Sequence, residues 1–284
     1  MDGPSPLWLV TNPASGSNAS EAIEALEACC RRHGFAIGGH TRFPEQDLPN
    51  PDDLEAKGIR RVAVFAGDGT INSLLTHFRG WSGAVLVLPG GTMNLLYHRL
   101  HGERSMEEAI AAVAAGEARL RRPGMIRCPQ GDSYAGVLAG PGTSWGEVRE
   151  TMREAAVPEV AASALRAVEE TLGGEWVACA EPRLGRAEGY PLITLTPYDD
   201  AIRIHAYHAE APEDYLEQAW ALLRRNFREG PHEALGRVPS VRLAGANGHP
   251  FGLLIDGDEA PSAPDVEFRL VPSEVDLVAT EVDG

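Results

Sequence analysis

The sequence has few cysteines, few basic residues and no long apolar run. Its four cysteines include no Cys-x-x-Cys pair, which argues against zinc-ribbon and thioredoxin-type sites. No apolar run approaches the roughly 20 residues that a membrane-spanning helix needs. The first six residues also lack the basic segment that opens a secretory signal. We therefore expect a protein of the reducing cytoplasm.

Basic residues are outnumbered by acidic ones. The protein has 25 Lys and Arg against 41 Asp and Glu, a formal net charge of −16 at pH 7. A surface of this sign repels the phosphates of nucleic acid and anionic lipid headgroups. The composition thus argues against a nucleic-acid partner and allows at most a transient contact with a membrane. It leaves the oligomeric state open.

The sequence is long enough for one large domain or two modest ones. It has 284 residues, of which 43% are hydrophobic. In its first part, short apolar runs of the kind that form buried strands alternate with segments of helical spacing. The apolar runs are residues 7–10, 62–65 and 84–88, and the helical segments include 19–33, 71–78 and 105–116. This alternation predicts an α/β domain with a parallel sheet over residues 1–122.

The pattern changes beyond Pro123. Short strand-like runs follow one another, interrupted by two helical segments at 160–172 and 213–227. This predicts a mostly antiparallel β-sandwich domain over residues 123–284. The cleft between two such domains is the usual place for a ligand.

Three glycine-bearing loops, at residues 12–18, 66–72 and 89–94, follow the three apolar strands. In a parallel α/β sheet these loops meet at one edge, where ligands bind. Glycine lets the backbone approach a phosphate closely, and the following helix N-terminus adds partial positive charge. Each loop alone is typical of an ordinary strand-to-helix turn, but the three together predict a phosphate site. Its polar side chains are the hydroxyls of Ser15, Thr70 and Thr92 and the amides of Asn12, Asn72 and Asn94.

Asp68 stands inside the second loop, Gly67-Asp68-Gly69-Thr70. A carboxylate beside a polyphosphate is repelled unless a cation lies between them, or unless it takes a proton from an attacking hydroxyl. Asp68 therefore indicates phosphoryl transfer assisted by Mg²⁺.

The three loops, in this order, resemble the catalytic domain of the diacylglycerol kinase family, which includes sphingosine kinases and bacterial lipid kinases. The family motifs N-P-x-S-G, G-G-D-G-T-x-N and P-x-G-T-x-N are similar to residues 12–16, 66–72 and 89–94. A further Asp-Gly-Glu of the family is similar to Asp256-Gly257-Asp258. The resemblance implies ATP and Mg²⁺ as cofactors and a lipid or amphipathic alcohol as the substrate that is phosphorylated.

The resemblance also implies roles for single residues. It places the nucleotide against Asn12, Ser15, Gly67, Gly69, Thr70, Thr92 and Asn94. It makes Asp68 and Asp256 the catalytic carboxylates. We expect Asp68 on the phosphate side and Asp256 facing the acceptor hydroxyl, although the choice of base between them stays open. The protein ligands of the metal stay unassigned.

Two departures from the family pattern keep other functions open. Ala66 stands where the family has the first glycine of its second motif, and the family's mid-sequence G-x-G-x-D-A is reduced to residues 140–145 without the acidic residue. One alternative is an NAD kinase-like or other soluble-alcohol kinase that shares the Gly-Asp-Gly loop. The other is a nucleotide-binding relative without catalytic activity.

Overall fold

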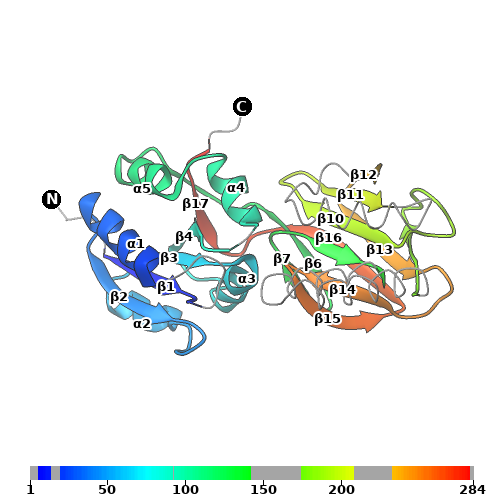
Figure 1. Cartoon of the computed structure of the whole chain (residues 1–284), viewed down its shortest axis with the longest axis horizontal. Helices are drawn as coiled ribbons and strands as arrows, with labels where there is room; N and C mark the ends of the chain where they lie inside the picture. Colours follow the sequence, from blue (N-terminus) through cyan, green and yellow to red (C-terminus); the bar gives the residue numbers. More distant parts are fainter. Residues whose placement is uncertain (1–5, 14–19, 92, 142–173, 208–231, 282–284) are drawn as a thin grey trace, which may run out of the picture. The chain divides into compact units, whose positions relative to one another are not determined.

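The protein forms two compact units (Figure 1). The computed structural model describes residues 6–13, 20–91, 93–141, 174–207 and 232–281. The first unit comprises Met1–Pro123 with Pro272–Gly284, and the second comprises Gly124–Val271. The second domain therefore ends at Val271 rather than at the predicted residue 284, because the C-terminal segment returns to the first unit.

The first unit holds a six-stranded sheet in the order β2-β1-β3-β4-β17-β5. Its neighbouring strands are parallel except for β5, which is antiparallel to β17. The strands are β1 (Leu7–Thr11), β2 (Ile37–Arg42), β3 (Arg61–Ala66), β4 (Ala84–Pro89), β5 (Arg119–Arg121) and β17 (Asp276–Ala279). The helices are α1 (Ser20–Arg32), α2 (Pro51–Ala56), α3 (Asp68–His77), α4 (Leu95–His101) and α5 (Met106–Ala114).

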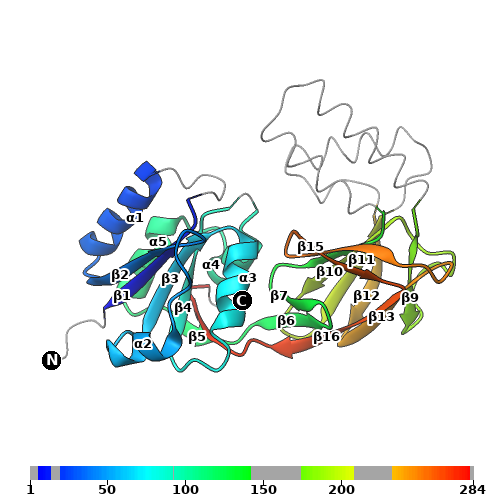
Figure 2. The same cartoon turned by 90° about the horizontal axis from the view of Figure 1, so that it is seen from below.

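The central strands of this sheet are buried on both faces. Figure 2 shows β1, β3 and β4 side by side. One face of these strands packs in a single cluster with apolar residues of α1 and α5, among them Leu26, Cys30 and Ile110. Right-handed crossovers place α2 and α3 on the opposite face, since the backbone runs from β1 outward to β2 and then back across to β3. This arrangement confirms the predicted α/β domain with a parallel sheet.

The strand β17 is one of the parts of the first unit that local sequence patterns do not reveal. It pairs in parallel with β4 and antiparallel with β5. Leu277, Val278 and Ala279 are almost completely buried in it. A four-residue strand carries too little periodicity to be assigned to a sheet whose other strands lie far away in the sequence.

The second unit contains two β-sheets, in the orders β12-β11-β10-β8-β14-β15 and β7-β6-β16-β13-β9. The strand pairs whose register is defined are antiparallel in both sheets. The strands of the first sheet are β8 (Val137–Ala139), β10 (Leu192–Pro197), β11 (Ile202–Tyr207), β12 (His232–Val238), β14 (Phe251–Ile255) and β15 (Asp258–Ala263). Those of the second are β6 (Gly124–Cys128), β7 (Gly131–Ser133), β9 (Val177–Glu181), β13 (Ser240–Gly245) and β16 (Asp265–Pro272).

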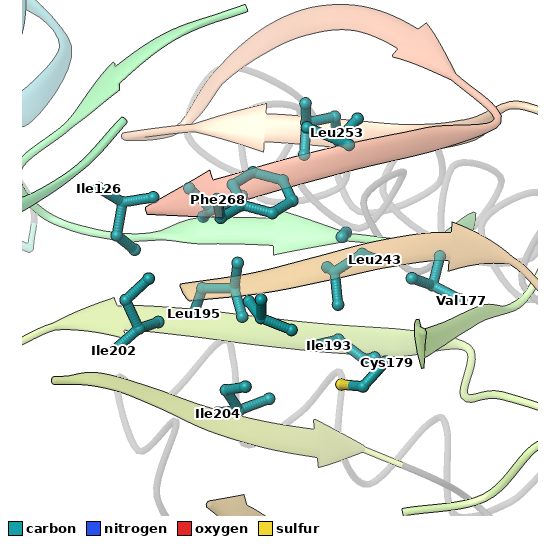
Figure 3. Packing of buried hydrophobic residues seen from close by; sticks show 14 of the residues in the cluster. Ile126, Val177, Cys179, Ile193, Leu195, Ile202, Ile204, Leu243, Leu253 and Phe268 are labelled. Atoms are coloured by element: carbon teal, nitrogen blue, oxygen red, sulfur yellow. The ribbon is translucent and has the colours of Figure 1, made fainter. Parts of the chain in front are cut away.

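One core joins the two sheets of the second unit. Ile193 and Leu195 of β10 pack in the same cluster as Leu243 of β13 and Phe268 of β16 (Figure 3). Burial alternates along β10, as expected for a strand with one face toward a core. The predicted antiparallel β-sandwich is thereby confirmed. The predicted helical segments at 160–172 and 213–227 lie outside the described residues.

None of the helices in the described ranges has both the length and the apolar composition to cross a lipid bilayer.

Candidate functional site

The site predicted from the sequence lies where the strand order of the first sheet reverses direction. From β1 the backbone moves outward to β2, then returns to β3 on the other side of β1. The loops that leave β1 and β3 consequently diverge, and such a point at the carboxyl ends of the strands is where α/β sheets bind ligands. Asn12 directly follows β1, and Gly67 directly follows β3.

A hydrogen bond between two side chains joins the first two loops. Asn12 Nδ2 donates to Thr70 Oγ1 at 2.9 Å, and Asn12 N donates to the carbonyl oxygen of Phe65 at 3.3 Å. Since Thr70 acts as the acceptor toward Asn12, its own hydroxyl proton can be donated elsewhere. A phosphate oxygen requires such a donor.

Backbone contacts join the second and third loops. Gly90 N donates to the carbonyl oxygen of Ala66 at 3.2 Å. A Cβ atom at Gly91 would lie 2.6 Å from Gly67 Cα, so the two loops approach each other more closely than any other residue type at position 91 would allow. Ala66 is completely buried and pairs with Pro89 as the last residue of β3. The Ala66 methyl group therefore packs within the sheet. The alanine at this position does not alter the turn, which begins at Gly67.

The third loop is closed by Asn94, which lies in the left-handed region with φ 51° and ψ 42°. Asn94 Oδ1 accepts from Gly91 N at 2.7 Å, and Asn94 Nδ2 donates to Gly91 O at 2.9 Å. Asparagine is one of the few residue types that adopt this backbone conformation readily. Asn94 thus holds the loop in shape immediately before α4.

Asp68 connects the second loop to the third. Its Oδ2 accepts from Leu95 N at 3.3 Å, and its Oδ1 accepts from Leu96 N at 3.4 Å. These are long hydrogen bonds to the first turn of α4, and both carboxylate oxygens of Asp68 take part in them. The sequence motif points to Asp68 as a functional residue but carries no sign of this contact.

The helix α3 begins at Asp68 with Gly67 as its N-cap, and no side chain caps it. The first N–H groups of a helix have no partner within the helix, and they carry its partial positive charge. Gly69 and Thr70 lie in this first turn. The turn is consequently suited to an anion. Ser15 and Thr92 lie outside the described residues.

A row of polar side chains supports the end of β1, and sequence patterns do not reveal it. Thr11 Oγ1 lies 2.9 Å from His40 Nε2, and His40 Nδ1 lies 3.3 Å from Glu27 Oε1. Burial lowers the pKa of His40, which the Glu27 carboxylate partly offsets. A neutral ring with Nδ1 protonated toward Glu27 would accept the Thr11 hydroxyl at Nε2. The three residues come from α1, β1 and β2, so their spacing carries no local signal.

Asp256 lies in the second unit, in the turn between β14 and β15, with φ 52°. Its Oδ1 accepts from Ser133 Oγ at 2.5 Å, Ala135 N at 2.9 Å and Gly136 N at 3.0 Å. Its Oδ2 accepts from Tyr134 N at 2.9 Å. Burial raises the pKa of Asp256 to about 6, while these hydrogen bonds act in the opposite direction. Asp256 therefore fastens the β14–β15 turn to the segment between β7 and β8.

The structure thus brings together Asn12, Gly67, Asp68, Thr70 and Asn94 in the first unit. Gly69 lies beside them in α3. Asp256 belongs to the second unit.

Comparison with known proteins finds similarity to diacylglycerol kinases in part of the sequence and in the fold. Residues 6–125 match the model of the diacylglycerol kinase catalytic domain. Two solved structures from Bacillus anthracis str. Sterne, described as candidate diacylglycerol kinases, have TM-scores of 0.62 and 0.61 at 12% identity. The matches cover 98% and 97% of this protein and 96% and 97% of the two relatives. A third structure from the same organism, described as a diacylglycerol kinase, has a TM-score of 0.58 at 11% identity, with 97% of both proteins covered. No curated protein sequence matches.

Proposed function

We propose that this protein is an ATP-dependent kinase, because its residues 6–125 match the model of the diacylglycerol kinase catalytic domain. Its acceptor would be a hydroxyl group of a lipid or amphipathic alcohol, such as a diacylglycerol or a sphingoid base. We place the reaction in the cytoplasm, with at most a transient contact with the membrane that supplies the acceptor.

One observation carries the proposal. Three loops from adjacent strands are tied together at the switch point of a parallel sheet, by the Asn12–Thr70 bond, the Gly67–Gly91 approach and the Asp68 bonds to α4. The described part of this site presents the N–H groups of the first turn of α3 and the Thr70 hydroxyl in a fixed geometry, which lowers the cost of ordering these groups when a nucleotide binds. We assign the phosphates of ATP to it.

The site is also suited to Mg²⁺. The ion prefers oxygen ligands, and nucleotide-bound Mg²⁺ usually takes one or two carboxylates besides phosphate oxygens. Asp68 is the carboxylate at the first turn of α3, and its two hydrogen bonds to α4 are long. Asp68 would hold the ion, which would neutralise the charge of the transferring phosphoryl group.

We assign the second carboxylate role to Asp256. A hydroxyl that attacks a phosphate needs a group to accept its proton, and such a base works best with a pKa near the working pH. Burial raises the pKa of Asp256 to about 6. Three of its hydrogen bonds reach Oδ1, whereas Oδ2 accepts the Tyr134 N–H, so Oδ2 has capacity for a proton.

The test is a phosphotransfer assay with labelled ATP and Mg²⁺. The acceptors are a lipid extract, a dispersed diacylglycerol, a sphingoid base, glycerol and NAD, each assayed separately. We expect label in the organic phase with at least one lipid. Label found only in glycerol phosphate or in NADP would replace the lipid acceptor by a soluble one. If no acceptor is labelled although Mg-ATP binds normally, the protein is better explained as a nucleotide-binding relative of the kinases without catalytic activity.

A further inference from the structure

A thiol, an imidazole and a carboxylate meet where α1 packs against α5. They belong to Cys29 of α1, His33 directly after α1, and Glu107 in the first turn of α5. One ligand atom of each residue lies within 4.8 Å of those of the other two. His33 Nε2 lies 3.9 Å from Glu107 Oε1. None of these residues belongs to the proposed nucleotide site.

Regular secondary structure holds the three side chains in place. Cys29 and His33 are four residues apart, and His33 N donates to Cys29 O at 3.1 Å, so both lie on one face of the last helical turn. Glu107 is positioned by the start of α5. That start is fixed by a capping box in which Ser105 and Glu108 bond each other's backbone N–H groups.

The imidazole has an unsatisfied acceptor or donor. His33 Nε2 is buried and has no hydrogen-bond partner among the residues that the structure describes. A buried polar atom without a partner is costly, and a cation at its lone pair would remove that cost. Cys29 beside it is only 4% exposed.

We propose that Cys29, His33 and Glu107 form a binding site for Zn²⁺ or a similar divalent transition metal. Sulfur and nitrogen ligands suit Zn²⁺, whereas Mg²⁺ and Ca²⁺ prefer oxygen alone. Zn²⁺ binds Cys, His and carboxylate ligands at about 2.0–2.3 Å, and three protein ligands leave a fourth position for water. Ligand atoms around one ion then lie about 3–4 Å apart. Small rotations of the side-chain torsions would bring the three ligand atoms from their observed separations to this distance.

Arg32 is the competing cation at this site. Its Nη1 lies 2.7 Å from Glu107 Oε1, but both side chains are more than half exposed. An exposed ion pair contributes little free energy, so a divalent ion can displace the arginine or share the carboxylate through its second oxygen. The metal would bind the Cys29 thiolate in place of its proton and would link α1 to α5.

The test uses the purified full-length protein, freed of metal, without nucleotide. Co²⁺ serves as the spectroscopic probe because it occupies Zn²⁺ sites and shows a thiolate-to-metal charge-transfer band when sulfur binds it. We expect one equivalent of Co²⁺ to produce that band, Zn²⁺ to abolish it by displacement, and Zn²⁺ to raise the melting temperature. Cys29→Ser should remove the band, and Cys128→Ser, a thiol change in the second unit, should leave it unchanged.

Variants of His33, Glu107 and Arg32 should change the metal affinity in different directions. His33→Gln and Glu107→Gln should each weaken metal affinity by at least about 10-fold. Arg32→Gln removes a competing positive charge and should bind the metal at least as tightly as the wild type. A wild-type protein without the charge-transfer band, or a band that persists in Cys29→Ser, overturns the proposal. Circular dichroism of each metal-free variant verifies its folding.

Discussion

Asn12 Nδ2 donates a hydrogen bond of 2.9 Å to Thr70 Oγ1, and this bond spans the point where the sheet reverses its strand order. It directly links the loop after β1 to the first turn of α3. The proposed phosphate site depends on these two segments keeping one relative position.

Thr70→Val removes this acceptor while keeping the shape of the residue. We expect Mg-ATP affinity to fall about 10-fold, since the bond and a phosphate donor are lost together. Isothermal titration calorimetry measures the effect. Thr76→Val is the matched control, because Thr76 is exposed near the other end of the same helix and its hydroxyl donates to its neighbour Asn72. Equal affinities for the two variants would separate Thr70 from nucleotide binding.

Gly91→Ala tests the close approach of the second and third loops. The added Cβ would lie 2.6 Å from Gly67 Cα, so one loop must move. We expect the free energy of unfolding to fall by about 1–3 kcal/mol, and ATP affinity to fall with it. Denaturant unfolding and calorimetry measure the two effects.

Gly80→Ala is the control for backbone strain alone. Gly80 has φ +77° and nothing within 4 Å of an added Cβ. This variant should lose about 1 kcal/mol of stability and keep its nucleotide affinity. If Gly91→Ala also keeps its affinity, the third loop does not touch the nucleotide.

Asp68→Asn tests the metal-side carboxylate. The variant loses the negative charge, and its amide nitrogen would face an N–H group of α4. We expect kcat to fall at least about 100-fold and the Mg²⁺ concentration needed for half-maximal activity to rise. Steady-state kinetics at several Mg²⁺ concentrations measure both. Asp52→Asn, in the first turn of α2, is the control. An unchanged Mg²⁺ dependence would remove Asp68 from the metal site.

Asp256 makes stability depend on pH with a defined sign. Its pKa is raised from 3.8 to about 6 in the folded protein, so the folded state holds the proton more tightly than the unfolded state. The stabilising contribution is therefore complete below pH 3.8 and is lost as the pH rises through about 6. Denaturant unfolding should show a larger loss between pH 3.8 and about 6 in the wild type than in Asp256→Asn, which keeps the other titrating groups such as Asp258. If the wild type instead gains stability relative to the variant between pH 3.8 and about 6, the pKa of Asp256 is not raised in the folded protein.

The sequence predicts the parts of this protein that depend on neighbouring residues. The apolar runs before residues 12, 67 and 90 predict the strands, and the parallel sheet then requires their loops to meet at one edge. The Ser105–Glu108 capping box at the start of α5 is likewise local, because its two residues are three positions apart.

The parts that could not be predicted depend on contacts between distant segments. Asp256 bonds to the segment 133–136, and its turn sequence alone does not indicate that partner. The same holds for β17, which completes a sheet formed by the first part of the sequence. Cys29 and Glu107 come from different helices, so counting cysteine spacings does not reveal the proposed metal site.

The central claim is that the first turn of α3 binds the phosphates of Mg-ATP. Calorimetric titration of Mg-ATP into wild type, Gly69→Val and Ser73→Val tests it most directly. Gly69 lies in that first turn, whereas Ser73 is exposed one turn further along the same helix. We predict that Gly69→Val loses at least about 1–3 kcal/mol of binding free energy, through a clash and lost N–H contacts. Ser73→Val should bind like the wild type, and a Gly69→Val variant that also binds Mg-ATP with unchanged affinity would contradict the account.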